Sequence, residues 1–112
     1  MDRRTILESL VRFEREMDEL RTELDSLPWG AAPQLVALRR THLQNVLRRF
    51  LTGNLCTDAV AQWASLVGER EDIAVEGGRH GPAGEAVFVL ANPHFTLPLT
   101  FATAKYLWSR LK

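Results

Sequence analysis

The sequence has no second cysteine, no excess of charge of either sign and no long apolar run. Its single thiol, Cys56, cannot form an internal disulfide, so a reducing cytoplasm is the expected location. Fourteen basic and fourteen acidic residues give a formal net charge of zero, whereas proteins that bind nucleic acid through its phosphates are normally basic. No segment has the ~20 consecutive apolar residues of a membrane span, and the mixed charges after Met1 are unlike a signal peptide. These absences disfavour a secreted disulfide scaffold, a nucleic-acid binder and a membrane protein.

Signatures of catalysis and of metal or cofactor binding are also missing. The three histidines are His42, His80 and His94. They fall in different segments, and none has a Cys, His or carboxylate at metal-ligand spacing. Cys56 has no local activating pattern, and the glycine-rich residues 76–84 lack the Gly-Lys-Ser/Thr of a phosphate loop. We therefore expect no enzyme, no metal site, no cofactor and no small-molecule substrate.

What the sequence does have is the composition of one globular domain over residues 1–112, with 46% apolar and 25% charged side chains. Helical periodicity dominates, so we expect an all-α fold: a small bundle of four to five helices with a long N-terminal helix. The alternative is an α+β fold with a small hairpin around residues 72–90, where Ile73 and Val75 alternate and residues 87–90 form an apolar, β-branched-rich run. Of the two, we favour a short helix over about residues 84–91, ended before Pro93.

The first helix is expected over about residues 3–27. Apolar side chains recur there at alternating spacings of four and three: Ile6, Leu10, Phe13, Met17, Leu20, Leu24 and Leu27. Pro28-Trp29-Gly30 then provides a stop. The stripe predicts packing inside a bundle, with extra width from Leu7 and Val11. The alternative is a coiled-coil seam that makes a homodimer through the first helix.

The second helix is expected from Pro33 to about Leu51, with Gly53 as a left-handed cap. On a helical wheel Arg39 falls on its apolar side, where an arginine needs a carboxylate partner or a route to water. The interpretation is a structural one, with an ion pair to the first or third helix or a side chain that reaches solvent, and the alternative is a partner-binding role. Arg48 and Arg49 point away from that side.

The third helix is expected to start around residues 56–58, and a last helix to cover about residues 98–111. The third helix has a buried face and an opposite polar stripe. The buried face is Val60, Trp63, Ala64 and Val67, and the polar stripe is Asp58, Gln62, Ser65 and Glu69. The polar stripe is either a solvated face or a partner contact.

Charge alternates in sign along the chain. Residues 1–30 carry five basic and eight acidic side chains (−3), and residues 31–55 carry four arginines and no acid (+4). Residues 56–92 carry two basic and six acidic side chains (−4), and residues 93–112 carry three basic and no acidic ones (+3). Either neighbouring helices pair their opposite charges, or an acidic and a basic surface face different ways, one of them toward a partner.

The order of motifs over residues 35–111 resembles that of small bacterial, self-protective, colicin-type immunity proteins. The pattern is an "LRRFLxGxL" helix end, a capped helix bearing "WA", an "ERED-I" segment and an "LANP" element before a closing helix. The matching residues are Leu47-Arg48-Arg49-Phe50-Leu51, Gly53, Leu55, Trp63-Ala64, Glu69-Arg70-Glu71-Asp72-Ile73 and Leu90-Ala91-Asn92-Pro93. The first helix lies outside the resemblance.

The resemblance implies a stoichiometric inhibitor that binds a cognate toxin domain made by the same cell. An acidic helix face could occupy the basic cleft of a toxin that cuts nucleic acid. The expected partner-binding residues are Asp58, Gln62, Trp63, Glu69, Glu71 and Asp72, with Trp63 partly core and partly an anchor. The alternative, from another class, is a helical dimerisation or adaptor protein without catalytic activity.

Overall fold

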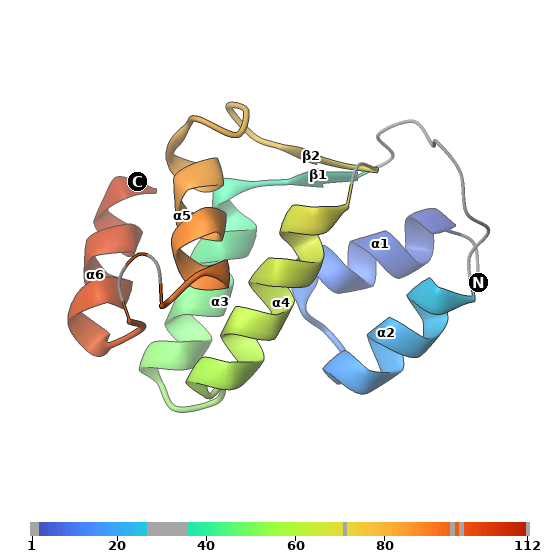
Figure 1. Cartoon of the computed structure of the whole chain (residues 1–112), viewed down its shortest axis with the longest axis horizontal. Coiled ribbons are helices and arrows are strands. Elements are labelled where there is room, and N and C mark those ends of the chain that lie inside the picture. Colours follow the sequence, from blue (N-terminus) through green and yellow to red (C-terminus); the bar gives the residue numbers. More distant parts are fainter. Residues whose placement is uncertain (1–2, 27–35, 71, 95, 97, 112) are drawn as a thin grey trace.

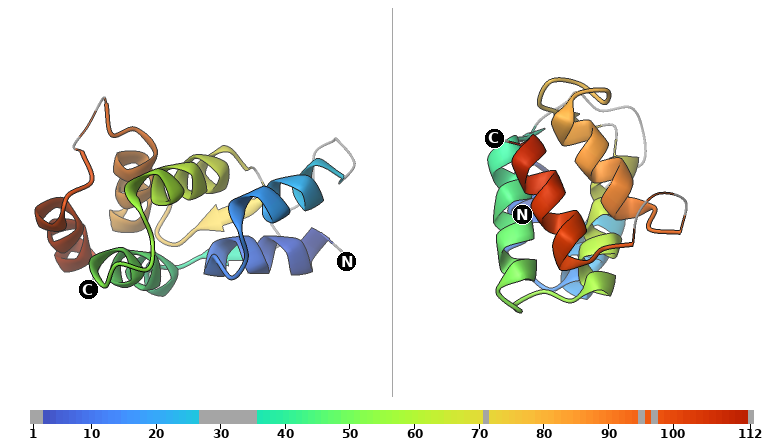
Figure 2. Two further views of the ribbon diagram at one scale, coloured as in Figure 1. Left: turned by 90° about the horizontal axis from the view of Figure 1, so that it is seen from below. Right: turned by 90° about the vertical axis from the view of Figure 1, so that its left-hand side faces the viewer.

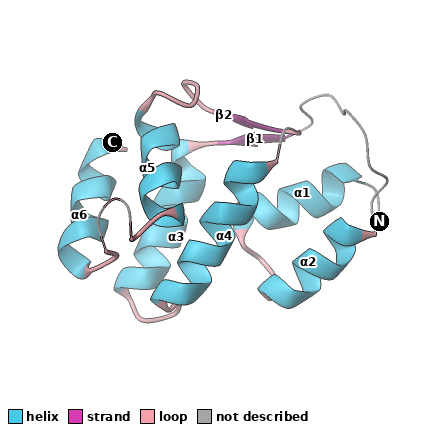
Figure 3. Cartoon of the chain, viewed as in Figure 1, coloured by secondary structure: helices cyan, strands magenta, loops and turns pink. Residues whose placement is uncertain are grey.

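A computed structural model describes residues 3–26, 36–70, 72–94, 96 and 98–111 (Figure 1). Within these residues there are six helices and one two-stranded sheet (Figure 3). In chain order they are α1 (Arg3–Arg12), α2 (Met17–Asp25), β1 (Val36–Leu38), α3 (Arg40–Leu51), α4 (Thr57–Glu69), β2 (Ile73–Val75), α5 (Pro82–Ala91) and α6 (Phe101–Arg110). The mostly helical character is confirmed, whereas the expectation of an all-α bundle of four to five helices is not met by these elements.

The expected long first helix is broken in two. α1 ends at Arg12, Phe13 has a φ of 52°, and α2 begins at Met17. A non-glycine residue in the left-handed region is uncommon, and here contacts from distant helices hold it. Arg49 Nη1 donates a hydrogen bond to the Phe13 carbonyl at 2.7 Å, and the Phe13 ring stacks on Trp63 with 5.9 Å between centroids. The expected stop at residues 28–30 lies outside the described residues.

The break lets α1 and α2 fold back on each other, and their apolar stripe enters the core of the monomer. The buried members of the stripe are Ile6, Leu10, Phe13, Met17, Leu20 and Leu24. Leu27 is outside the described residues. Packing inside the domain, the first interpretation of the stripe, therefore accounts for all six described members. A dimer seam formed by the same residues would require them to leave the core.

The expected second helix begins later than Pro33. Residues 36–38 are strand β1, which pairs in parallel with β2 in the register Val36 to Ile73 and Leu38 to Val75. The hairpin alternative is therefore wrong, since residues 82–91 form helix α5 and the partner of β2 comes from before α3. The strand expected around Ile73 and Val75 is present as β2, but it pairs in parallel with β1, which is distant in the sequence.

Two arginines lie differently from the expectation, Arg39 because α3 begins only at Arg40 and Arg49 because it contacts Phe13. Arg39, expected on the apolar side, is exposed and precedes the helix. Arg49, expected to point away, is half-buried over Phe13, with its guanidinium 5.3 Å from the ring centroid. Arg48 is exposed, as expected.

Most of the other helix ends lie close to their predicted positions. Gly53, with a φ of 87°, follows α3, and Cys56 precedes α4. α5 ends at Ala91, before Pro93, and Thr100 caps α6 by accepting a hydrogen bond from the Thr103 backbone at 3.2 Å. The predicted buried face of α4 is also confirmed, with Val60, Trp63, Ala64 and Val67 all buried.

The helices lie in two layers, with α2 and α4 over α1 and α3 (Figure 2, left). In Figure 1, α4 runs across the middle of the molecule, with α2 on one side and α5 on the other. None of the described helices is long and apolar enough to cross a bilayer. One face of α4 is thus left uncovered between its neighbours.

Candidate protein-binding surface

The uncovered face of α4 carries the predicted polar stripe. Asp58, Gln62 and Glu69 are exposed, and Ser65 is half-buried. They lie on one side of the helix because the spacings of four, three and four follow its turn. The stripe therefore forms a polar ridge along α4.

Trp63 does not belong to this surface. Its side chain has no exposed area, and its indole N–H donates a hydrogen bond to the Leu10 carbonyl at 2.6 Å. The core role expected for Trp63 is confirmed, but the expected anchor role is wrong, since the ring cannot reach a partner without leaving the core.

Asp72 is also inside the protein, with 4% of its surface exposed. Arg70 donates to both of its carboxylate oxygens, at 2.9 Å each, and Arg3 lies 4.0 Å away. The hydrogen bonds from Arg70 lower the pKa of Asp72 below its ordinary value, against the opposing effect of burial. Asp72 thus ties β2 to α1 and to the end of α4, and it is not a partner contact; Glu71 lies outside the described residues.

Asp58 and Gln62 line a hollow of about 670 Å³ at the N-terminal ends of α2 and α4, which we call the acidic groove. Its acidic members are Glu14, Glu16, Asp18, Glu19 and Asp58. Its basic members are Arg15 and Arg49, so the charge balance is −5 + 2 = −3. Phe13, Met17, Leu55 and Ala59 provide the apolar part of the lining.

Three carboxylates of the acidic groove have no ion-pair partner among the described residues. Glu14 pairs with Arg12 at 3.4 Å and Glu19 with Arg15 at 3.3 Å. Glu16, Asp18 and Asp58 make no such pair within 4.0 Å in the described part of the chain, and all three are exposed. Asp18 and Asp58 lie in the first turns of α2 and α4, where the helix dipoles favour negative charge. The groove therefore presents fixed negative charge to solvent.

The acids at positions 14–19 were not predicted as site residues. In one continuous helix they would have been spread around its circumference, but the break at Phe13 gathers them beside the start of α4. The density of acids in residues 14–19 was the signal that could have found them.

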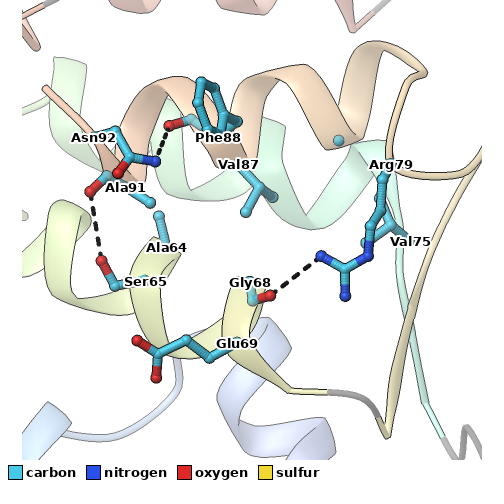
Figure 4. A pocket seen from close by; sticks show the side chains of 11 residues that line it. Ala64, Ser65, Gly68, Glu69, Val75, Arg79, Val87, Phe88, Ala91 and Asn92 are labelled. Atoms are coloured by element: carbon cyan, nitrogen blue, oxygen red, sulfur yellow. Dashed lines mark hydrogen bonds between the residues drawn. The ribbon is translucent and has the colours of Figure 1, made fainter. Parts of the chain in front are cut away.

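A second hollow lies at the other end of the ridge, between α4 and α5, and we call it the apolar cleft (Figure 4). Its volume is about 250 Å³. Small and apolar side chains line it: Ala64, Gly68, Val75, Val87, Phe88 and Ala91. Polar groups at its edge come from Ser65, Glu69, Arg79 and Asn92. Among the described acids of the predicted site, Glu69 is the other exposed one, and it belongs to this cleft and not to the acidic groove.

No family model, curated protein or solved structure matches the chain. Among the residues that the structure describes, no three His, Cys, Asp or Glu side chains are grouped so that they could hold a metal ion. The arguments for function therefore start from the two hollows and the ridge between them.

Proposed function

We propose that this chain is an immunity-type protein that binds a cognate bacterial toxin domain and neutralises it by stoichiometric protein–protein inhibition, without catalysis. The observation that carries the proposal is the acidic groove, with its balance of −3 and its exposed carboxylates Glu16, Asp18 and Asp58. Domains that act on nucleic acids need basic clefts for the phosphates, and a negatively charged surface of this kind is complementary to them.

The chain is neutral overall, so the attraction has to be local. Some charges elsewhere pair within the fold, as in Arg40–Glu76 and Arg110–Glu85 at 2.9 Å each, whereas Glu16, Asp18 and Asp58 in the groove make no ion pair in the described part of the chain. An exposed charged surface accelerates association more than it adds affinity, and added salt weakens the effect. The order of motifs from Leu47 to Pro93 supports the same family of functions. We place the protein in the cytoplasm, where its exposed free thiol, Cys56, would stay reduced.

The experiment measures binding between the purified chain and the toxin-like C-terminal domain encoded by the adjacent gene, using titration calorimetry. We expect a one-to-one complex whose affinity falls as salt is raised from about 50 to 200 mM, because salt screens exposed charges. The double variant Glu16→Lys with Asp58→Lys should bind at least roughly tenfold more weakly, a loss of about 1.4 kcal/mol.

The matched control for the single change Asp58→Lys is Asp25→Lys, which makes the same charge change of +2 at an exposed site in the last turn of α2, away from the groove. It should bind like the unchanged chain. Failure of the two purified proteins to bind, or equal weakening by the groove and control variants, would contradict the proposal.

A further inference from the structure

We infer that the partner lies along the ridge of α4 and makes two separate contacts: basic side chains in the acidic groove, and one aromatic or branched aliphatic side chain in the apolar cleft. This inference rests on the proposed function and deepens it, since it assigns a second site to the same partner. The occupant is thus a basic protein segment with an apolar anchor at a set distance from its basic residues.

The apolar cleft has the size of a pocket for one side chain. Its 250 Å³ is several times the ~30 Å³ that one water molecule occupies, yet it lies below the ~300–1,000 Å³ of pockets that enclose whole ligands. Its floor is made of small groups, Ala64 and Gly68 from α4 and Ala91 from α5. A single apolar side chain would therefore find contacts on both helices.

Phe88 forms a wall of the cleft, although 59% of its surface is exposed. Its neighbours on α5, Val87 and Val89, are buried, so Phe88 is the large apolar group that this helix leaves outside the core. Phe is one of the aromatic residues that are enriched in protein interfaces relative to the rest of the surface.

The mouth of the cleft carries two opposite charges that do not pair with each other. Arg79 Nη1 donates to the Gly68 carbonyl at 3.3 Å, and the Glu69 carboxylate points away from Arg79 (Figure 4). Neither side chain makes an ion pair with another described residue. These groups would form a polar rim around an apolar anchor, which is the usual anatomy of an interface.

The ridge connects the two hollows. Asp58 and Gln62 line the acidic groove, whereas Ser65 and Glu69, on the same side of α4, line the cleft. On a helical wheel Ala59 turns toward the α2 flank, and Ala64 and Gly68 turn toward the α5 flank. The hollows thus lie at opposite ends and on opposite flanks of one exposed helix face.

The spacing determines the kind of segment that fits. Asp58 and Glu69, the outermost residues of the ridge in the two hollows, are eleven residues apart, so about 16 Å along the helix axis at ~1.5 Å per residue is the largest spacing that the ridge sets. An extended chain covers this distance in about five residues at ~3.3 Å each. The inferred occupant therefore has its basic residues up to about five positions away from the aromatic or aliphatic anchor.

A pair of synthetic peptides tests this without any toxin. Both carry two lysines at one end, and five positions away one has Phe and the other has Ala. In two-dimensional ¹⁵N–¹H NMR spectra of the full chain, the Phe peptide should shift amides of the groove, such as Asp18 and Asp58, together with amides of the cleft, such as Gly68 and Val87. The Ala peptide should shift only the groove. Shifts confined to the groove with both peptides would overturn the inference.

A matched pair of variants tests the same contact in the complex with the toxin domain. Phe88→Ala should weaken toxin binding roughly tenfold or more, as the loss of a hot-spot aromatic does. Phe101→Ala removes a Phe of equal exposure, 61% against 59%, from the start of α6, outside both hollows, and should change affinity less than about twofold. Ser65→Leu is the second cleft variant. Ser65 is half-buried on the ridge and lines the cleft, so the larger leucine side chain should narrow the mouth of the cleft and weaken binding as well.

The two proposals fail in different ways. If Phe88→Ala and Ser65→Leu bind like the unchanged chain while Glu16→Lys with Asp58→Lys weakens binding, the inference is wrong and the proposed function stands. If the toxin domain does not bind at all, the proposed function is wrong, and the peptides still report whether the cleft accepts an apolar anchor.

Discussion

Phe13 is the residue on which the shape of the candidate surface depends. Its left-handed backbone, with a φ of 52°, costs roughly 1–2 kcal/mol for an L-residue other than glycine. Three contacts compensate for this cost. Arg49 of α3 donates a hydrogen bond to the Phe13 carbonyl, its guanidinium lies over the Phe13 ring, and the Trp63 ring of α4 stacks on that ring. Because the chain turns there, the acids of residues 14–19 reach the start of α4 and form the acidic groove.

Replacing Arg49 should therefore destabilise the fold. Arg49→Gln removes the 2.7 Å hydrogen bond to Phe13 and the contact with its ring, and we expect a loss of about 1–3 kcal/mol in the free energy of unfolding. Arg48→Gln is the matched control, since the Arg48 side chain is exposed and, among the described residues, hydrogen-bonds only to Asn45 on its own helix. It should change stability by less than about 0.5 kcal/mol. Urea unfolding followed by fluorescence measures both, and equal effects would show that Arg49 does not hold the break.

At the scale of elements, the sequence predicts those helix ends that depend on the residues at the end itself. Gly53 ends α3 because a left-handed backbone suits glycine, and Pro93 follows α5 because it cannot continue a helix. The break after Arg12 has no such local signal, since residues 13–16 contain neither proline nor glycine. It depends on Arg49 and Trp63, which lie far away in sequence, so periodicity alone predicts one continuous helix.

The sheet was also missed because it depends on residues that are distant in the sequence. Val36–Leu38 and Ile73–Val75 are only three residues each, too short for an alternation that differs from a helical turn. Their parallel pairing joins segments 37 positions apart, which no hairpin signal can indicate. The error at Arg39 follows from this sheet, since the strand takes residues that the wheel had counted as helix.

The start of α3 provides a pH-dependent element. His42 Nδ1 accepts a hydrogen bond from the Arg39 backbone N–H at 3.0 Å, which requires the neutral imidazole. Burial, followed by the positive charges of Arg12 and Arg39, lowers the pKa of His42 from its ordinary 6.5. As the pH falls through about 6.5, the unfolded chain takes up a proton before the folded one does, so stability declines until the folded His42 is protonated as well.

We expect this decline to begin as the pH falls below about 7 and to be no larger than about 1 kcal/mol, the usual contribution of a helix cap. His42→Glu keeps an acceptor at the same helix position and should remove the decline. His80→Gln, at an exposed position outside the helices, should keep it. Thermal unfolding at several pH values measures this, and a pH dependence that is the same for the His42 and His80 variants would contradict the assignment.

At the scale of the whole molecule, the alternating charge of the sequence has two outcomes. Two ion pairs, Arg40–Glu76 and Arg110–Glu85, join segments of opposite sign, as the pairing of neighbouring elements predicts, whereas most of the others lie within one segment. Two acids at the helix break, Glu16 and Asp18, make no ion pair in the described part of the chain, and they line the acidic groove together with Asp58. The sequence thus predicts Asp58, Gln62 and Glu69 as exposed residues, but not that they lie in two separate hollows, because that division depends on how α2 and α5 flank α4.

The last prediction concerns the oligomeric state. Leu10 has no exposed surface, and its carbonyl accepts the Trp63 N–H, so the apolar stripe belongs to the core of one chain. We therefore expect light scattering to give the mass of one chain, 12.7 kDa, at all concentrations. Leu10→Ala should lower the free energy of unfolding by about 2–5 kcal/mol, as truncation of a core leucine does, without changing this mass.

Leu66→Ala is the control for truncation of a leucine that is only half-buried, and it should cost less stability than Leu10→Ala. A dimer through the first helix makes the opposite prediction, because its seam would hold two chains together through the stripe. In that case the mass of the unchanged chain would rise with concentration toward twice 12.7 kDa, and Leu10→Ala would return it to one chain. That pattern would show that the stripe leaves the core to join two molecules, and the acidic groove, which depends on the break in the same helix, would then have to be assigned anew.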